Sequence, residues 1–149
     1  MFRLFKGEAV DDLVLVSSPS NASITAQLGN RFERELIYTN LGDVLVSVNP
    51  YKYLPITGDE YIKVTHIKKR KIAYPLITDH GYPTQMYQFA AGSGKAAPPP
   101  HIYDLAERMY RRLAEESESQ CVIISGESGA GKTVAAKLIL QYVTTVSPR

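Results

Sequence analysis

Three scarcities narrow the classes to which this 149-residue sequence can belong. Cys121 is the only cysteine, so no internal disulfide can form, which favours a protein of the reducing cytoplasm. No apolar run reaches the length of a signal-peptide core or a membrane span, so we expect a soluble chain with no membrane segment. Seventeen basic residues against fifteen acidic ones leave a net charge of only +2, which does not favour nucleic acid as a partner.

Hydrophobic periodicity predicts an α/β organisation for a chain long enough to form one domain or part of a larger one. Apolar residues recur at helical spacing in residues 20–35 and, more clearly, in residues 101–116. Residues 121–125 read as a buried strand, a glycine-rich loop follows, and residues 133–143 have the pattern of another helix. Helix, strand, loop and helix therefore follow one another at the end of the sequence.

The middle of the chain is less regular. Residues 36–48 have the β-branched and aromatic content of a strand, interrupted by Leu-Gly-Asp at residues 41–43. The dipeptide Asn-Pro then ends the strand and places residues 49–55 on a loop. Residues 58–100 mix basic, proline-rich and small-residue stretches, so we expect them to be mostly irregular. A Gly-Lys pair in residues 92–95 lacks a following hydroxyl residue and is interpreted as linker.

The sequence GESGAGKT satisfies the phosphate-loop pattern G-x-x-x-x-G-K-[ST]. Glycines let the backbone curl so that successive N–H groups can face phosphate oxygens, and the helix that follows adds its positive end. Lys132 would reach the β and γ phosphates, and the Thr133 hydroxyl would ligate Mg²⁺. The predicted phosphate-binding residues are Gly126, Glu127, Ser128, Gly129, Ala130, Gly131, Lys132 and Thr133.

Three segments resemble the myosin motor head. They are GESGAGKT itself, the preceding PPHIYDLAERMYRRL, and the earlier LVSVNPYKYLP, and they occur in the order that this family uses. Residues 7–50 resemble heads that begin directly with this segment, and TVAAK after the loop is similar to the short, single-headed class-one myosins. The resemblance covers nearly all of the chain outside about residues 57–90.

The resemblance implies an ATP-driven, actin-based motor whose head is an α/β, P-loop NTPase-type mixed sheet with flanking helices. It implies ATP and Mg²⁺ as ligands, with Thr133 as the metal ligand, and it places residues 49–55 beside the purine. The purine-side residues are Asn49, Pro50, Tyr51 and Lys52, whereas Thr57 stands where the family has a tyrosine. Actin filaments and calmodulin-type light chains are the implied partners, through regions outside this sequence, and the implied location is the cytoplasmic actin cytoskeleton.

The resemblance also predicts limits to what the chain does alone. The family's two switch loops, which complete phosphoryl transfer, lie downstream of the helix that follows the phosphate loop. We therefore expect residues 1–149 to be the amino-terminal part of a motor domain, with no catalytic residue of its own and no ATP turnover. We expect residues 57–90 to be an atypical surface insertion or, over residues 57–83, a gene-model artefact.

Two other hypotheses stay open. One is a different P-loop enzyme, such as a small-molecule kinase or a GTPase, although the loop usually comes near the start of those domains and here lies near the end. The other is an inactive myosin remnant that keeps the fold signals without activity.

Overall fold

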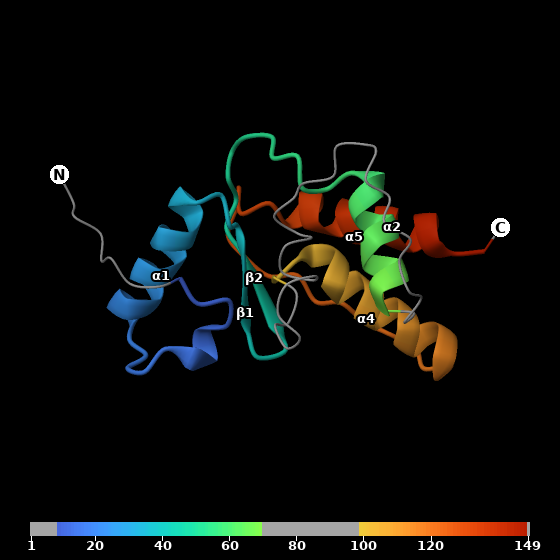
Figure 1. Cartoon of the computed structure of the whole chain (residues 1–149), viewed down its shortest axis with the longest axis horizontal. Helices are drawn as coiled ribbons and strands as arrows, with labels where there is room; N and C mark the ends of the chain where they lie inside the picture. The colour runs from blue at the N-terminus through green and yellow to red at the C-terminus, as the bar shows by residue number, and fades with distance from the viewer. Residues whose placement is uncertain (1–8, 70–98, 149) are drawn as a thin grey trace.

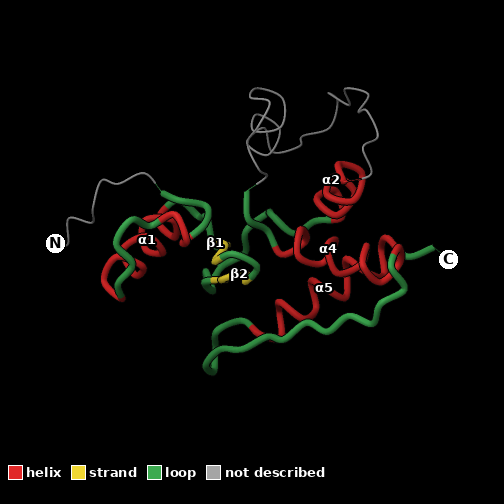
Figure 2. The backbone as a smooth tube through the Cα atoms, turned by 90° about the horizontal axis from the view of Figure 1, so that it is seen from below, coloured by secondary structure: helices red, strands yellow, loops and turns green. Residues whose placement is uncertain are grey.

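The computed structural model describes residues 9–69 and 99–148 of the chain. In both views the β-hairpin lies between helix α1 (Asn21–Glu33) on one side and three helices on the other (Figures 1 and 2). These three helices are α2 (Asp59–Lys69), α4 (Ile102–Glu115) and α5 (Lys132–Val146). The connection before α5 runs back past the helices toward the hairpin, and it brings the glycine-rich loop of residues 126–131 next to the loop of residues 49–55 (Figure 1).

The hairpin consists of strands β1 (Tyr38–Leu41) and β2 (Val44–Ser47), which pair antiparallel. The turn between them contains Gly42, whose φ of +57° lies in the left-handed region that glycine adopts without a Cβ clash. The predicted strand with a break at residues 41–43 is therefore confirmed as a hairpin. The loop predicted over residues 49–55 is confirmed as well.

Helix α1 (Asn21–Glu33) begins at a reciprocal capping box, in which Ser20 and Ser23 each accept the other's backbone N–H. Near its end, the buried Arg31 donates to the carbonyl oxygens of Val10 and Tyr38 and to the carboxylate of Asp11, at 2.7–2.8 Å. One guanidinium therefore joins α1 to strand β1 and to the segment that precedes the short 3₁₀ helix η1 (Leu13–Leu15).

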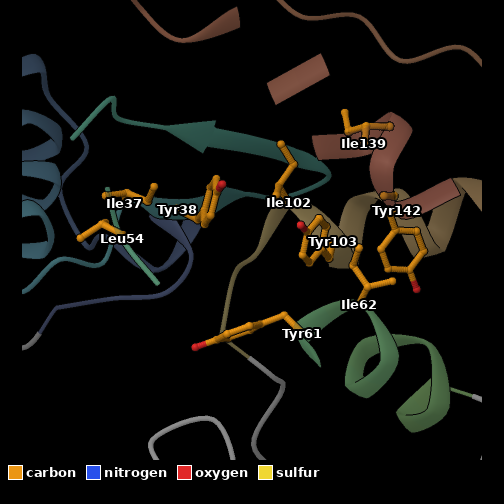
Figure 3. Close-up of a cluster of buried hydrophobic side chains, with 10 residues drawn as sticks. Ile37, Tyr38, Leu54, Tyr61, Ile62, Ile102, Tyr103, Ile139 and Tyr142 are labelled. Carbon is orange, nitrogen blue, oxygen red and sulfur yellow. The ribbon is translucent and has the colours of Figure 1, made fainter. Parts of the chain in front are cut away.

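Helices α2 (Asp59–Lys69), α4 (Ile102–Glu115) and α5 (Lys132–Val146) pack on one another. The core between them and the hairpin is largely aromatic and branched aliphatic (Figure 3). Its buried apolar residues are Ile37, Tyr38, Leu54, Tyr61, Ile62, Ile102, Tyr103, Ala106, Ile139 and Tyr142. The helices predicted over residues 101–116 and 133–143 are confirmed as α4 and α5.

Two expectations for the middle and end of the chain were wrong. Part of the stretch predicted to be irregular, residues 58–100, forms α2, because Tyr61 and Ile62 occupy the core. Residues 70–98 of the same stretch, including 92–95, lie outside the described residues. Residues 121–125 form no strand, since within the described ranges no strand pairs with them. Cys121 is exposed and Ile123 is 88% exposed, so the expected burial of this segment is also wrong here.

Within the described residues, the structure contains helices and a small two-stranded sheet. None of these helices is both long enough and apolar enough to cross a membrane.

Candidate phosphate-binding site

The glycine-rich loop of residues 126–133 owes its shape to its glycines. Gly126, Gly129 and Gly131 all have positive φ, at +151°, +80° and +92°. L-residues with a Cβ rarely adopt these angles, so the loop's path depends on glycine at these three places. At Gly129 there is also little space, because a Cβ would lie 3.2 Å from the hydroxyl oxygen of Tyr51.

Helix α5 begins directly after this loop. Gly131 is its N-cap residue and accepts the first helical hydrogen bond, from the N–H of Ala135 at 2.9 Å. No side chain caps this helix and its first turn contains no acidic residue. The first-turn N–H groups and the positive end of the helix dipole are therefore available to an acceptor from outside the helix.

Lys132, the first residue of α5, turns its side chain back over the loop. Its Nζ donates to the carbonyl oxygens of Gly126 at 2.6 Å and Glu127 at 2.8 Å. These bonds place the ammonium group across residues 126–127, where it adds positive charge to the N-terminal end of α5. Thr133, the next residue, is exposed.

The loop of residues 49–55 contacts the glycine-rich loop directly. Asn49 Nδ2 donates to the Gly129 carbonyl at 2.7 Å, and the Tyr51 hydroxyl donates to the same oxygen at 3.1 Å. Lys52 instead forms an ion pair with Glu35 at 2.5 Å, between two side chains that are both more than half exposed. The structure therefore brings Asn49 and Tyr51 to the loop, whereas the Lys52 ammonium pairs with Glu35.

The opposite half of α5 is held by a buried polar cluster. Tyr142 donates its hydroxyl to Glu107 of α4 at 2.6 Å, and His66 of α2 lies 3.0 Å from the same carboxylate oxygen. Burial and the bond to Glu107 raise the pKa of Tyr142 above its usual value, so this hydroxyl stays protonated and keeps donating. Gln141 of α5 also donates to Asp59 of α2, at 3.1 Å.

The buried His101 is the N-cap of helix α4. Its Nδ1 accepts the N–H of Tyr103 at 3.1 Å, and its Nε2 donates to the carbonyl of Ile56 at 2.9 Å. Since one nitrogen accepts and the other donates, the ring is neutral. Burial lowers the pKa of His101 to about 4, which opposes the smaller contributions of Ile56 and Asp104.

The residues present suit a magnesium-bound polyphosphate. The positive-φ glycines, the uncapped start of α5 and the Lys132 ammonium all favour an anion, and Thr133 presents a hydroxyl oxygen of the kind that Mg²⁺ accepts as a ligand. The described residues contain no cluster of three His, Cys, Asp or Glu side chains able to hold a metal by themselves.

Sequence reasoning missed the buried polar partners. Glu107 is fully buried, although glutamate usually lies on the solvated face of a helix. It lies four residues after Tyr103 and three before Tyr110, so its helical spacing from these tyrosines was a usable signal. The cap at His101 had no such signal, because histidine is not among the common N-cap residues.

The sequence is similar to those of known proteins along nearly its whole length. Residues 10–149 match the family model described as myosin head (motor domain). The chain is 61% identical over 148 residues to Myosin-K heavy chain of Dictyostelium discoideum, covering 99% of this chain and 14% of that protein. It is 43% identical over 142 residues to Myosin IC heavy chain of the same organism, covering 95% of this chain and 10% of that protein.

These relatives are much longer than this chain, which spans 10–14% of their length. Myosin IA heavy chain of Dictyostelium discoideum shows the same relation, with 40% identity over 144 residues, 97% of this chain and 12% of that protein. The family model matches nearly the whole chain and therefore identifies its family. The chain belongs to the myosin head family, the motor domain of myosins.

Proposed function

We propose that residues 126–133 bind the phosphates of MgATP in an actin-based myosin motor. The observation that carries this proposal is the glycine-rich loop, which leads into an uncapped helix and is crossed by the Lys132 ammonium. Family membership supports the same ligand, since members of the family are myosin motor heads. It does not favour the alternative of a small-molecule kinase or a GTPase.

The proposed roles of the residues follow from their positions. Backbone N–H groups of the loop and the first turn of α5 donate to phosphate oxygens. The Lys132 ammonium leaves its two carbonyl acceptors for the β and γ phosphates, and the Thr133 hydroxyl becomes a ligand of Mg²⁺. Bound Mg²⁺ supplies charge neutralisation at the phosphates. Residues 49–52 are proposed to border the purine.

The remaining proposals concern the whole motor. By family, it would be an ATPase that moves on actin filaments in the cytoplasm and carries calmodulin-type light chains. Its head would be a mixed sheet in which residues 121–125 pair as a strand. The exposure of Ile123 supports a strand at residues 121–125. A β-branched apolar residue that is 88% exposed in this chain is suited to burial by other segments of a complete motor domain.

Hydrolysis requires a group that orients the attacking water, in addition to a phosphate cradle. In the family this role belongs to the switch loops, so we propose that residues 1–149 alone bind nucleotide weakly and do not turn it over. The test is γ-phosphate release from purified residues 1–149. Turnover that disappears in Lys132→Ala would contradict the proposal.

Nucleotide binding itself is tested in the motor expressed from its complete reading frame. We expect a fluorescent ATP analogue to bind in a magnesium-dependent manner, and we expect Thr133→Ala to weaken that dependence. An unmodified motor that ignores ATP analogues would overturn the proposed function and favour the inactive-remnant hypothesis.

We propose that residues 57–90 are an atypical surface insertion or, over residues 57–83, a gene-model artefact. Helix α2 supports a genuine origin for the first part, since Tyr61 and Ile62 are buried in the core. Sequencing the transcript decides between the two: an abundant in-frame message that contains this stretch removes the artefact hypothesis.

A further inference from the structure

We propose that Asn49 and Tyr51 are positioning residues for the phosphate loop, acting through the Gly129 carbonyl. This inference rests on the proposed function, and it changes the role given to these two residues. Beside the purine they would act on the base, whereas their contacts are with the backbone of the loop that holds the phosphates.

The side-chain amide of Asn49 is engaged at both ends. Its Oδ1 accepts the backbone N–H of Tyr51 at 3.0 Å, and its Nδ2 donates to the Gly129 carbonyl at 2.7 Å. The first bond closes a local turn of the kind that asparagine favours, and it fixes which end of the amide faces the loop. Asn49 also packs beside Gly131, where an added Cβ would lie 3.8 Å from its Cβ and Cγ.

Tyr51 reaches the same carbonyl by an unusual backbone path. Its φ is +49°, a left-handed conformation that costs a bulky residue free energy unless other contacts hold it. The Asn49 turn holds the backbone, and the hydroxyl donates to Gly129 at 3.1 Å. The ring is 80% exposed, so burial of the ring does not explain this arrangement.

Two donors on one carbonyl determine the orientation of a peptide plane. The Gly129 carbonyl is directed toward Asn49 and Tyr51, and the Ala130 N–H of the same peptide donates to Glu127 at 3.2 Å. Because glycine at φ +80° can adopt alternative ψ angles with little cost, this peptide could otherwise rotate. A carbonyl rotated toward the phosphates would repel their oxygens, so holding it favours anion binding.

Asn49 and Tyr51 could act on the purine or on the glycine-rich loop, and these two roles predict different results for ligands that contain no purine. If Asn49 and Tyr51 contacted only the purine, their loss would weaken binding of MgATP and leave magnesium pyrophosphate unaffected. If they orient the loop, both ligands lose affinity by the same factor. The comparison of MgATP with pyrophosphate therefore isolates the positioning role.

The experiment measures dissociation constants for both ligands in the motor expressed from its complete reading frame. We expect Asn49→Ala to weaken both about tenfold and Tyr51→Phe to weaken both about threefold, since each removes one hydrogen bond at the loop. Thr144→Val is the control, because it deletes the hydroxyl of an exposed residue of α5 whose acceptors are the carbonyls of Leu140 and Gln141 in the same helix. It should change neither constant.

Melting temperatures distinguish positioning from general stability. Tyr51→Phe should keep the melting temperature of the parent within about 1 °C while affinity for both ligands falls, because it removes a single hydrogen bond between exposed groups. Loss of MgATP affinity with unchanged pyrophosphate affinity would overturn the inference and leave the proposed function standing, as would unchanged binding of both. A parent protein that binds neither ligand would overturn both.

Discussion

The two ends of helix α5 lie in contrasting environments. Toward its C-terminus, Ile139 and Tyr142 are buried against α4 and α2, and the Tyr142 hydroxyl joins a buried carboxylate. At its N-terminus, the Lys132 ammonium donates to two backbone carbonyls of the glycine-rich loop, and the Asn49 and Tyr51 side chains donate to the Gly129 carbonyl. One end of the helix therefore anchors it in the core, while the other presents polar groups that a ligand can reach.

The contrast teaches that stability and binding can be separated along one helix. Substitutions near Tyr142 should lower the free energy of unfolding, and substitutions near Lys132 should lower ligand affinity with little effect on folding.

Tyr142→Ala should lower the free energy of unfolding by about 3–5 kcal/mol, because it creates a cavity in the core and removes the hydroxyl donor of Glu107. Urea denaturation of the 149-residue chain followed by circular dichroism measures this change. Leu140→Ala is the control on the same helix, since Leu140 is exposed, and it should change the free energy by under about 0.5 kcal/mol. Equal changes in the free energy of unfolding for the two variants would contradict the conclusion that Tyr142 anchors α5 in the core.

Lys132→Ala should weaken MgATP binding by about 10- to 100-fold in the complete motor, because it removes a charged donor to phosphate. Its effect on the free energy of unfolding should stay below about 1 kcal/mol, since its partners are carbonyls of the exposed residues Gly126 and Glu127. Lys137→Ala removes the same charge from an exposed position further along α5 and should leave affinity intact. A comparable loss in both variants would point to general charge attraction.

Acidification should unfold the packed region through His101. Its folded pKa of about 4 lies below the unfolded value of 6.5, so the stability it contributes is complete above pH 6.5 and falls as pH drops toward 4. Between pH 7 and pH 5 the expected loss is about 2 kcal/mol. His101→Asn keeps a side-chain acceptor for the start of α4 and should flatten this pH dependence. An unchanged slope would show that another group titrates.

Ile123→Ser should have the smallest effect on the 149-residue chain, under about 0.5 kcal/mol, because the side chain is 88% exposed. In the complete motor we expect a loss of about 2 kcal/mol or more, because there the residue is proposed to lie in a buried strand. Thermal unfolding of both forms measures the difference. Equal, small effects would contradict the proposed sheet.

Local signals in the sequence predicted the local elements. The apolar spacing in residues 101–116 and the Leu-Gly-Asp break at residues 41–43 each depend on neighbours a few positions away, and both α4 and the hairpin turn were confirmed. The glycine-rich octet likewise contains its own conformational requirement, since its glycines take the positive φ angles that other residues avoid.

Contacts between distant segments were not predictable in this way. Asn49 and Gly129 are 80 residues apart, and nothing in either segment indicates that one carbonyl accepts from two side chains. Residues 121–125 had the composition of a buried strand, but a strand forms only where another strand supplies hydrogen bonds, and composition carries no information about that partner. Helix α2 was missed because its helical periodicity is weak.

The glycine at the start of α5 has a thermodynamic consequence. A serine or aspartate at the N-cap would accept hydrogen bonds from the first-turn N–H groups of α5. Gly131 has no side chain to do so, and a bound anion can accept these hydrogen bonds instead. Occupancy and helix stability then become linked quantities, so each raises the other. Amide hydrogen exchange in residues 132–135 should slow when ligand binds, and the slowing should fade toward Tyr142, where the helix is already rigid.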